Sequence, residues 1–261
     1  MGNNFLHRVI SGLKPTNRPD RPNPVSCALL GLALGAATFS SALKAETETE
    51  SAPPTIQPFN MTYGLTGSGV PFSISADRTL EKEGDGTWKM EIRARNWLGS
   101  IRETTRFTWD DCTPQSTVYE YRRRGLGRTR EARLELDREA GTAVATRTNS
   151  DDRHFEIDED TTDILSQTLG LQCALMRGER DSITLDVINE RRREPMQYQV
   201  TAEESIEVPA GRYSALKVER VRDDDSDRQT LLWFVPELGY ALARMVQDDG
   251  DGRYELVLRS P

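Results

Sequence analysis

Apolar and polar side chains alternate along most of the chain after residue 58. The first run places Phe59, Met61, Tyr63 and Leu65 two residues apart, and similar runs recur as far as residue 258. Because neighbouring side chains of a strand point to opposite faces, this spacing predicts strands that bury one face. The pattern therefore predicts roughly ten to twelve short strands in an antiparallel, all-β domain.

Turn-forming residues separate the alternating runs. Short sequences such as "EGDG", "REAG" and "DDGDG" favour tight hairpin connections. In "VPAGRYSALKVER" at residues 208–220, Pro209 fixes φ and Gly211 permits a positive φ. We therefore expect the chain to reverse after Val208 and to form a hairpin there.

One segment departs from the period of two. Residues 161–163, Thr-Thr-Asp, resemble a helix start, and Gly178 resembles a helix end. Between them, apolar side chains recur at spacings of three and four: Ile164, Leu165, Leu169, Leu171, Leu175 and Met176. We expect one helix here, packed against the sheet or inside a curved one.

A sheet with this many strands must curl, close or split to manage its edges. The expected fold of residues 58–261 is a single all-β domain. We expect a strongly curved antiparallel sheet or an open barrel, lipocalin-like or lipoprotein-carrier-like, with one helix packed on its concave side.

The N-terminal residues have the layout of an export signal. Basic residues, among them Arg8 and Lys14, precede a charge-free run at residues 25–39, and small residues follow. This order predicts a signal peptide over residues 1–45 and a periplasmic protein. The alternative is a retained segment that anchors the protein to the inner membrane. Residues 46–57 are polar and acidic and contain prolines, which indicates a flexible linker.

The charge of the chain argues against nucleic-acid binding. The whole chain has a net charge of −8, and residues 1–45 contribute five basic and one acidic side chain, so the remainder has about −12. Affinity for nucleic-acid phosphates comes from Lys and Arg. Two cysteines remain after residue 45, Cys112 and Cys173. Export permits their oxidation to a disulfide, and two separate buried thiols are the alternative.

Residues typical of catalytic sites are scarce. The only histidine after residue 45 is His154, and no G-x-S-x-G or C-x-x-C pattern occurs. We therefore predict no catalytic residues, no metal site and no cofactor. A hydrolase of unknown type is the least favoured alternative.

A basic stretch runs from Tyr119 to Arg130 in this acidic chain. Its arginines flank a Gly-Leu-Gly turn: Arg122, Arg123, Arg124, Arg128 and Arg130. They could meet lipid phosphates or an acidic partner surface. The alternative is a solvated hairpin whose arginines pair with Glu131, Glu135 and Asp137 across strands.

Several phrases together resemble a bacterial exported family, domain of unknown function 3108. They are "VPAGRYSALKVER", "WFVPELGY" at 233–240, the terminal "DDGDGRYELVLRS", "CTPQSTVYEYRRRGLGRTREARLELD" from Cys112 and "DILSQ" from Asp163. The resemblance covers residues 58–260. It implies export, a β-rich domain and a role in the cell envelope, and it carries no catalytic residues.

From these features we expect a non-enzymatic periplasmic protein. A lipid, or another apolar or amphipathic molecule, would bind in the curved sheet. The residues expected to line the site are Phe72, Trp88, Phe107, Trp109 and Trp233, and the basic hairpin would make a peripheral membrane contact through the headgroup. Two alternatives remain: the aromatic residues form an ordinary filled core, or the domain is an interaction or scaffold module for an envelope protein.

Overall fold

The computed structural model describes residues 55–67, 70–97, 99–125, 127–222, 226–250 and 252–261, and the side chains of residues 70–73 lie outside this description. The strands are β1 (Phe59–Gly67), β2 (Val70–Lys82), β3 (Trp88–Asn96), β4 (Gly99–Asp110), β5 (Thr113–Gly125), β6 (Arg128–Asp137), β7 (Thr142–Arg147), β8 (Ser150–Glu156), β9 (Thr161–Asp163), β10 (Ile183–Ile188), β11 (Arg193–Val208), β12 (Gly211–Arg220), β13 (Gln229–Val235), β14 (Ala241–Asp248) and β15 (Arg253–Ser260). The helices are α2 (Gln167–Met176) and a 3₁₀ turn, η1 (Pro236–Leu238).

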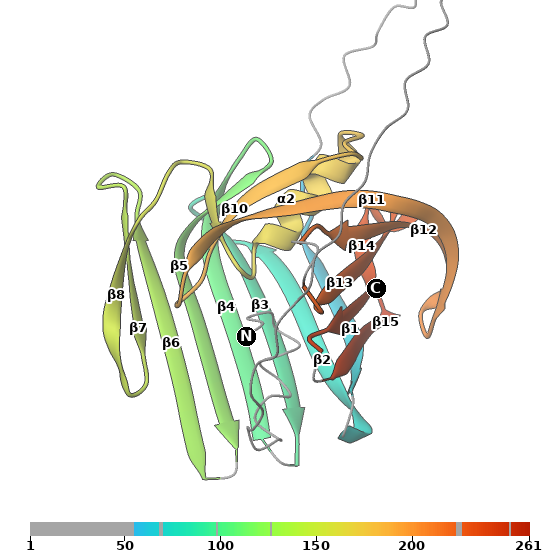
Figure 1. The fold of residues 1–261 in the computed structure, drawn as a ribbon, viewed down its shortest axis with the longest axis horizontal. Coiled ribbons are helices and arrows are strands. Elements are labelled where there is room, and N and C mark those ends of the chain that lie inside the picture. Colours follow the sequence, from blue (N-terminus) through green and yellow to red (C-terminus); the bar gives the residue numbers. More distant parts are fainter. Residues whose placement is uncertain (1–54, 68–69, 98, 126, 223–225, 251) are drawn as a thin grey trace, which may run out of the picture. The chain divides into compact units, whose positions relative to one another are not determined.

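All fifteen strands belong to one sheet, which confirms the all-β prediction (Figure 1). The order is β8-β7-β6-β5-β4-β3-β2-β1-β15-β14-β13-β12-β11-β10-β9. Strands adjacent in sequence pair with each other, apart from β8 and β9, which are the two ends of the order, and β1 also pairs with β15 in the middle of it. All pairs are antiparallel apart from β9 with β10.

More strands are present than the alternation predicted. Strand β8 has the sequence Ser-Asp-Asp-Arg-His-Phe-Glu, and nearly all of its side chains are exposed. It is an edge strand with no apolar face, so a period of two could not reveal it. Strand β9 has only three residues, which is too short for a period to be visible.

The sheet is strongly curved and does not close. Its register shifts at several points, among them Arg106/Phe107 and Val200/Ala202, and such bulges bend the strands. As a result β9, at one end of the strand order, lies against β5, which is the fourth strand from the other end. Strands β6, β7 and β8 continue beyond this contact (Figure 1).

The expected helix forms, but its start was predicted too early. Thr161–Asp163 is strand β9, because its β-branched threonines pair with β10. The helix begins after Ser166. Asp163 still acts on this start, because its carboxylate accepts hydrogen bonds from the backbone N–H groups of Leu165 (2.7 Å) and Ser166 (3.1 Å).

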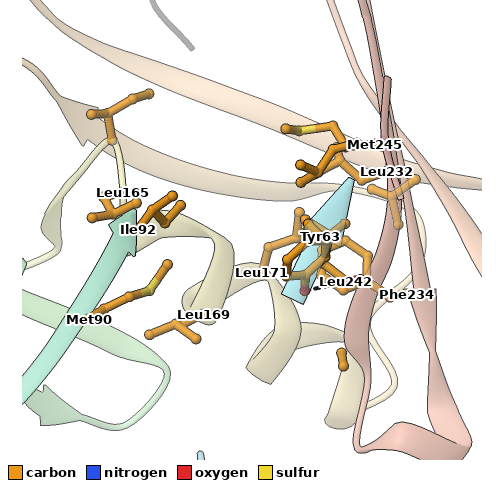
Figure 2. Close-up of a cluster of buried hydrophobic side chains, with 14 of the residues drawn as sticks. Tyr63, Met90, Ile92, Leu165, Leu169, Leu171, Leu232, Phe234, Leu242 and Met245 are labelled. Atoms are coloured by element: carbon orange, nitrogen blue, oxygen red, sulfur yellow. Dashed lines mark hydrogen bonds between the residues drawn. The ribbon is translucent and has the colours of Figure 1, made fainter. Parts of the chain in front are cut away.

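Helix α2 lies on the concave side of the sheet (Figure 1). Its buried residues surround the helix axis, as expected for a helix enclosed by the domain. Figure 2 shows Leu169 and Leu171 of α2 among side chains of β1, β3 and β13, including Tyr63, Met90 and Phe234. The interior next to α2 is therefore occupied by the protein's own side chains.

The hairpin at residues 208–211 forms as predicted. Val208 of β11 pairs with Gly211 of β12, and Gly211 has φ of 147°. A glycine adopts this angle without the steric cost that other residues incur. The backbone N–H of Ala210 donates to the carbonyl of Leu258, at 3.1 Å. The turn thereby reaches β15.

Cys112 and Cys173 form a disulfide, with Cα atoms 5.5 Å apart. The bond joins the turn between β4 and β5 to α2. Gly170 lies beside this turn, and a Cβ atom there would be only 3.2 Å from the carbonyl oxygen of Cys112. This glycine thus permits close packing of the turn against α2. An ion pair between Arg177 and Asp111 joins the same two elements.

The predicted signal peptide at 1–45 and most of the predicted linker at 46–57 lie outside the described residues. Within the described ranges, no helix combines the length and the apolar character needed to cross a bilayer.

We expect the Cys112→Ala/Cys173→Ala variant to be less stable than the wild type. The bond spans 61 residues, for which the loss of loop entropy corresponds to about 4 kcal/mol at most. Urea unfolding followed by circular dichroism measures the difference. Reductant should lower the stability of the wild type to that of the variant and leave the variant unchanged. Equal stability of the oxidised wild type and the variant would contradict the expectation.

Candidate functional site

A buried polar cluster surrounds Asp163, which has no exposed surface. Its Oδ2 atom accepts hydrogen bonds from the hydroxyl groups of Thr105 (2.6 Å), Ser116 (2.5 Å) and Ser166 (2.6 Å). Its Oδ1 atom accepts the two backbone bonds at the start of α2. We call Asp163, Thr105, Ser116 and Ser166 the Asp163 clasp. It joins β9 and α2 to β4 and β5.

Arg138 reinforces this junction from the chain segment after β6. Its guanidinium donates to three backbone carbonyls: Ser116 (2.9 Å), Asp158 (3.1 Å) and Thr161 (2.7 Å). Burial lowers the pKa of Arg138, and the carboxylates of Asp163 and Asp186 oppose that lowering. The contact between β5 and β9 is therefore held by charged hydrogen bonds on both sides.

The Asp163 clasp contains serines and a carboxylate, but its geometry is structural. A serine nucleophile needs a base and access to substrate. Here the hydroxyls of Ser116 and Ser166 both point at the same carboxylate, and both residues are fully buried. The cluster thus satisfies buried polar groups where the curved sheet meets itself.

The aromatic residues predicted to line a ligand site do not all lie together. Trp88 and Phe107 are paired across β3 and β4 and are buried in the core. Trp109 packs beside Phe107, with ring centroids 6.3 Å apart. Phe72 lies in β2, and its side chain is outside the description.

The placement of Trp233 with these residues is wrong. It alternates along β13 with Leu232 and Phe234, which belong to the interior cluster in Figure 2, so its side chain lies on the opposite face. There the indole lies between the Arg244 guanidinium and the Lys217 ammonium, 4.8 and 5.7 Å from the ring. Its N–H donates to Glu204 at 2.6 Å. Cation–π contacts and this hydrogen bond explain its burial.

The predicted basic residues lie near the tip of the β5–β6 hairpin, and the tip of the neighbouring β3–β4 hairpin lies beside them. The strand register aligns Arg95 with Ser100, Ser100 with Arg124, and Gly125 with Arg128. A Cβ atom on Gly99 would overlap the carbonyl oxygen of Arg124, so the two tips are in close backbone contact. We call Arg95, Trp97, Arg123, Arg124, Arg128 and Arg130 the arginine tip.

The charges of the arginine tip are not balanced locally. Arg122 pairs with Glu131 at 2.7 Å, while Glu120 and Glu135 pair with Arg133. In the described part of the chain, none of the five arginines of the arginine tip forms an ion pair. Arg123 and Arg130 even lie directly opposite one another in the ladder, which is a destabilising arrangement.

Two residues of the arginine tip, Arg95 and Trp97, were missed by the sequence analysis, and Trp97 is the hydrophobic one of the two. Its side chain is 81% exposed, in the turn between β3 and β4. Among described residues it is the single large hydrophobic side chain with such exposure. The signal was a tryptophan inside a turn sequence, Asn-Trp-Leu-Gly, where no core position is available.

His154 lies on the edge strand β8 with its side chain exposed. No group of three or more His, Cys, Asp or Glu side chains able to hold a metal ion occurs in the residues that the structure places.

Comparison with known proteins gives a family and a fold. The model of the family described as "Protein of unknown function (DUF3108)" matches residues 58–259. A similar solved structure is the beta-barrel-like protein of domain of unknown function DUF1849 from Brucella abortus. It superposes with a TM-score of 0.54 at 12% identity, over 78% of this chain and 96% of that chain. A comparison with curated proteins gave no significant match.

We expect Asp163→Ala to destabilise the domain by about 3–5 kcal/mol, because it leaves buried donors from three elements without their acceptor. Ser116→Ala should cost about 1–2 kcal/mol, since it removes one donor. Asp160→Ala, an exposed carboxylate three residues before Asp163, is the matched control and should change little. Urea unfolding measures all three, and an Asp163→Ala variant as stable as the control would refute a structural role.

Proposed function

This chain belongs to the DUF3108 family, and on that premise we propose that it is a non-enzymatic protein of the cell envelope that contacts anionic phospholipid. The description of the family names no activity. The contact surface in this proposal is the arginine tip. In this proposal Trp97 makes the apolar contact with the lipid, and the five arginines of the arginine tip contact the charged headgroups.

The observation that carries the proposal is the unbalanced positive charge around an exposed indole. The rest of the domain is acidic, yet the arginine tip holds five arginines without an ion partner in the described residues. Basic residues near an anionic membrane contribute about 1 kcal/mol each. Tryptophan favours the boundary between headgroups and acyl chains. Together these terms support reversible, salt-sensitive attachment.

The interior of the sheet favours this surface over a lipid site within the barrel. Helix α2 and the core side chains of β1, β3 and β13 pack together there (Figure 2). Trp88 and Phe107, two of the residues expected to line a ligand site, are part of that packed core. We therefore place lipid contact at the arginine tip.

A role as a scaffold module has less support from the sheet edges. An added strand needs an edge with accessible backbone and a compatible surface. Strand β8 presents Asp151, Asp152 and Arg153 at one edge, which is typical of edges that avoid pairing. An acidic protein surface remains the competing partner for the arginines.

The periplasm is the proposed location. Two features support it: the signal-like residues 1–45 and the Cys112–Cys173 disulfide. Disulfides persist in oxidising compartments such as the bacterial periplasm.

We expect Arg128→Glu to weaken binding to vesicles of phosphatidylcholine with 30% phosphatidylglycerol. The reversal changes the charge by two units, which corresponds to about 2 kcal/mol, or about 30-fold. Trp97→Ala should weaken binding further, and raised salt should weaken it in the wild type. Sedimentation with vesicles measures the bound fraction.

Arg212→Glu is the matched control. Arg212 is equally exposed, lies on another hairpin and pairs with Glu207, so its reversal changes the net charge without touching the arginine tip. All variants share the same N-terminal segment, so that segment cannot produce a difference between them. If Arg128→Glu and Arg212→Glu lowered binding equally, or if binding did not require phosphatidylglycerol, the proposal would fail. Binding that is insensitive to Trp97→Ala would favour the acidic protein partner.

A further inference from the structure

A row of polar side chains crosses the concave face of the sheet at one level. The strand register aligns Tyr198 of β11 with Arg220 of β12, and Thr230 of β13 with Gln247 of β14. Arg220 lies two residues after Val218, which pairs with Leu232 of the interior cluster. By the alternation of strands, these polar residues therefore face the same side as the core.

Two arginines meet in this row. Arg222 donates through Nη2 to the Thr230 hydroxyl at 3.2 Å, and Arg220 donates through Nη2 to Glu194 Oε1 at 3.2 Å. Burial lowers the pKa of Arg222 to about 10, and the positive charge of Arg220 adds to the lowering. The two guanidinium groups thus lie near each other in a poorly solvated place.

Among the described residues, the positive charge of the pair exceeds what nearby carboxylates supply. Glu194 is the carboxylate that contacts Arg220, and it is shared with Arg192 at 2.9 Å. In the described residues Arg222 forms no ion pair. Burying a charge without a counter-ion is costly, so an uncompensated pair of this kind needs a reason.

Unused hydrogen-bonding atoms gather at the same place. The side chain of Arg220 is only 8% exposed, and Gln247 is 2% exposed. Arg220 Nε, Arg222 Nε and Gln247 Oε1 are buried and have no hydrogen-bond partner among the described residues. Native proteins leave few such atoms, and each one calls for a specific explanation.

We propose that Arg220 and Arg222, with Thr230 and Gln247, form a binding site for a phosphate group. The flat fork of a guanidinium matches the oxygens of phosphate, and two free Nε–H groups beside a hydroxyl provide donors from several directions. Gln247 Oε1 is an acceptor, and it can take a hydrogen bond from the oxygen of inorganic phosphate that still carries a proton at neutral pH.

The residues around the site determine how much of the ligand, beyond its phosphate group, can be enclosed. The next level of the sheet is apolar, with Val218, Leu232 and Met245, and closes the site toward the core. Arg222 is half-buried and gives access from the end of the strands. The site accordingly takes the phosphate, while any remaining part of the ligand extends outward. Free phosphate and the phosphate of an amphiphile share this chemistry.

Isothermal titration calorimetry of the purified protein with inorganic phosphate, in a chloride-free buffer, tests the proposal. We expect saturable binding to the wild type and a loss of affinity of about tenfold or more in Arg222→Gln. Arg212→Gln, at an exposed arginine on another hairpin, should bind as the wild type does. Circular dichroism shows whether Arg222→Gln is folded, and Arg220→Gln provides a second test of the same pair.

Three results would overturn the proposal. They are no binding of phosphate by the wild type, equal affinity in Arg222→Gln and Arg212→Gln, and binding only after Asp223, Asp224 and Asp225 are all changed to Asn. The last result would mean that the chain's own carboxylates occupy the arginines.

Titration with dodecyl phosphate separates the two sources: tighter binding than inorganic phosphate that is lost in Arg222→Gln indicates an amphiphile, and equal binding indicates free phosphate.

This site is independent of the arginine tip. Arg222→Gln leaves the arginine tip intact, so vesicle binding should stay at the wild-type level even where phosphate binding is lost. The failure of one proposal is therefore distinguishable from the failure of the other.

Discussion

The contact that closes this curved sheet on itself depends on one buried carboxylate. A sheet that closes into a barrel is held by an unbroken ladder of backbone hydrogen bonds, and this sheet has no such ladder between its two ends. Asp163 takes its place with five accepted hydrogen bonds that come from β4, β5 and the start of α2. A buried charge is tolerable only when its hydrogen bonds are satisfied, so the carboxylate fixes all of these partners at once.

This mode of closure decides which parts of the sheet are free. Because β9 meets β5 and not the edge strand β8, the strands β6 to β8 continue past the point of closure. The β5–β6 hairpin lies at that boundary, so it is anchored by the closed part of the sheet and still presents its tip to solvent. Many arginines of the described residues are matched with carboxylates, as Arg244 is with Glu255. Our proposals rest on two groups that are not fully matched: the arginine tip, and the pair Arg220 and Arg222.

The sequence predicted most of the fold because most strands bury one face. It misplaced Thr161–Asp163, since Thr and Asp are common both before a helix and in a short strand, and only the pairing with β10 decides between them. It also placed Trp233 in the interior, although the apolar neighbours Leu232 and Phe234 leave it on the opposite face. When five consecutive apolar residues occupy a strand buried on both faces, hydrophobicity does not say which face is which.

The candidate sites differed in how far the sequence could reveal them. The basic hairpin was visible as composition, but the partners of each arginine depend on register, which pairs Arg122 with Glu131 and sets Arg123 against Arg130. Arg220 follows Leu216 and Val218 at the same spacing of two, so alternation alone predicts an arginine facing the core. The sequence could not show which carboxylates lie near Arg220 and Arg222. Glu194 comes from the neighbouring strand β11 and is shared with Arg192, which only the structure reveals.

The pairing of β1 with β15 has a consequence for how the chain reaches its fold. Strands β1 to β8 can pair in succession as they emerge, because each partner is the next in sequence. The middle of the sheet cannot be completed until the last strand is available, since Tyr63 must pair with Leu258. Contacts of such long sequence separation form slowly, because a long loop must be closed first. A chain that is delivered across a membrane before it folds meets this requirement, since both ends are then present on the same side.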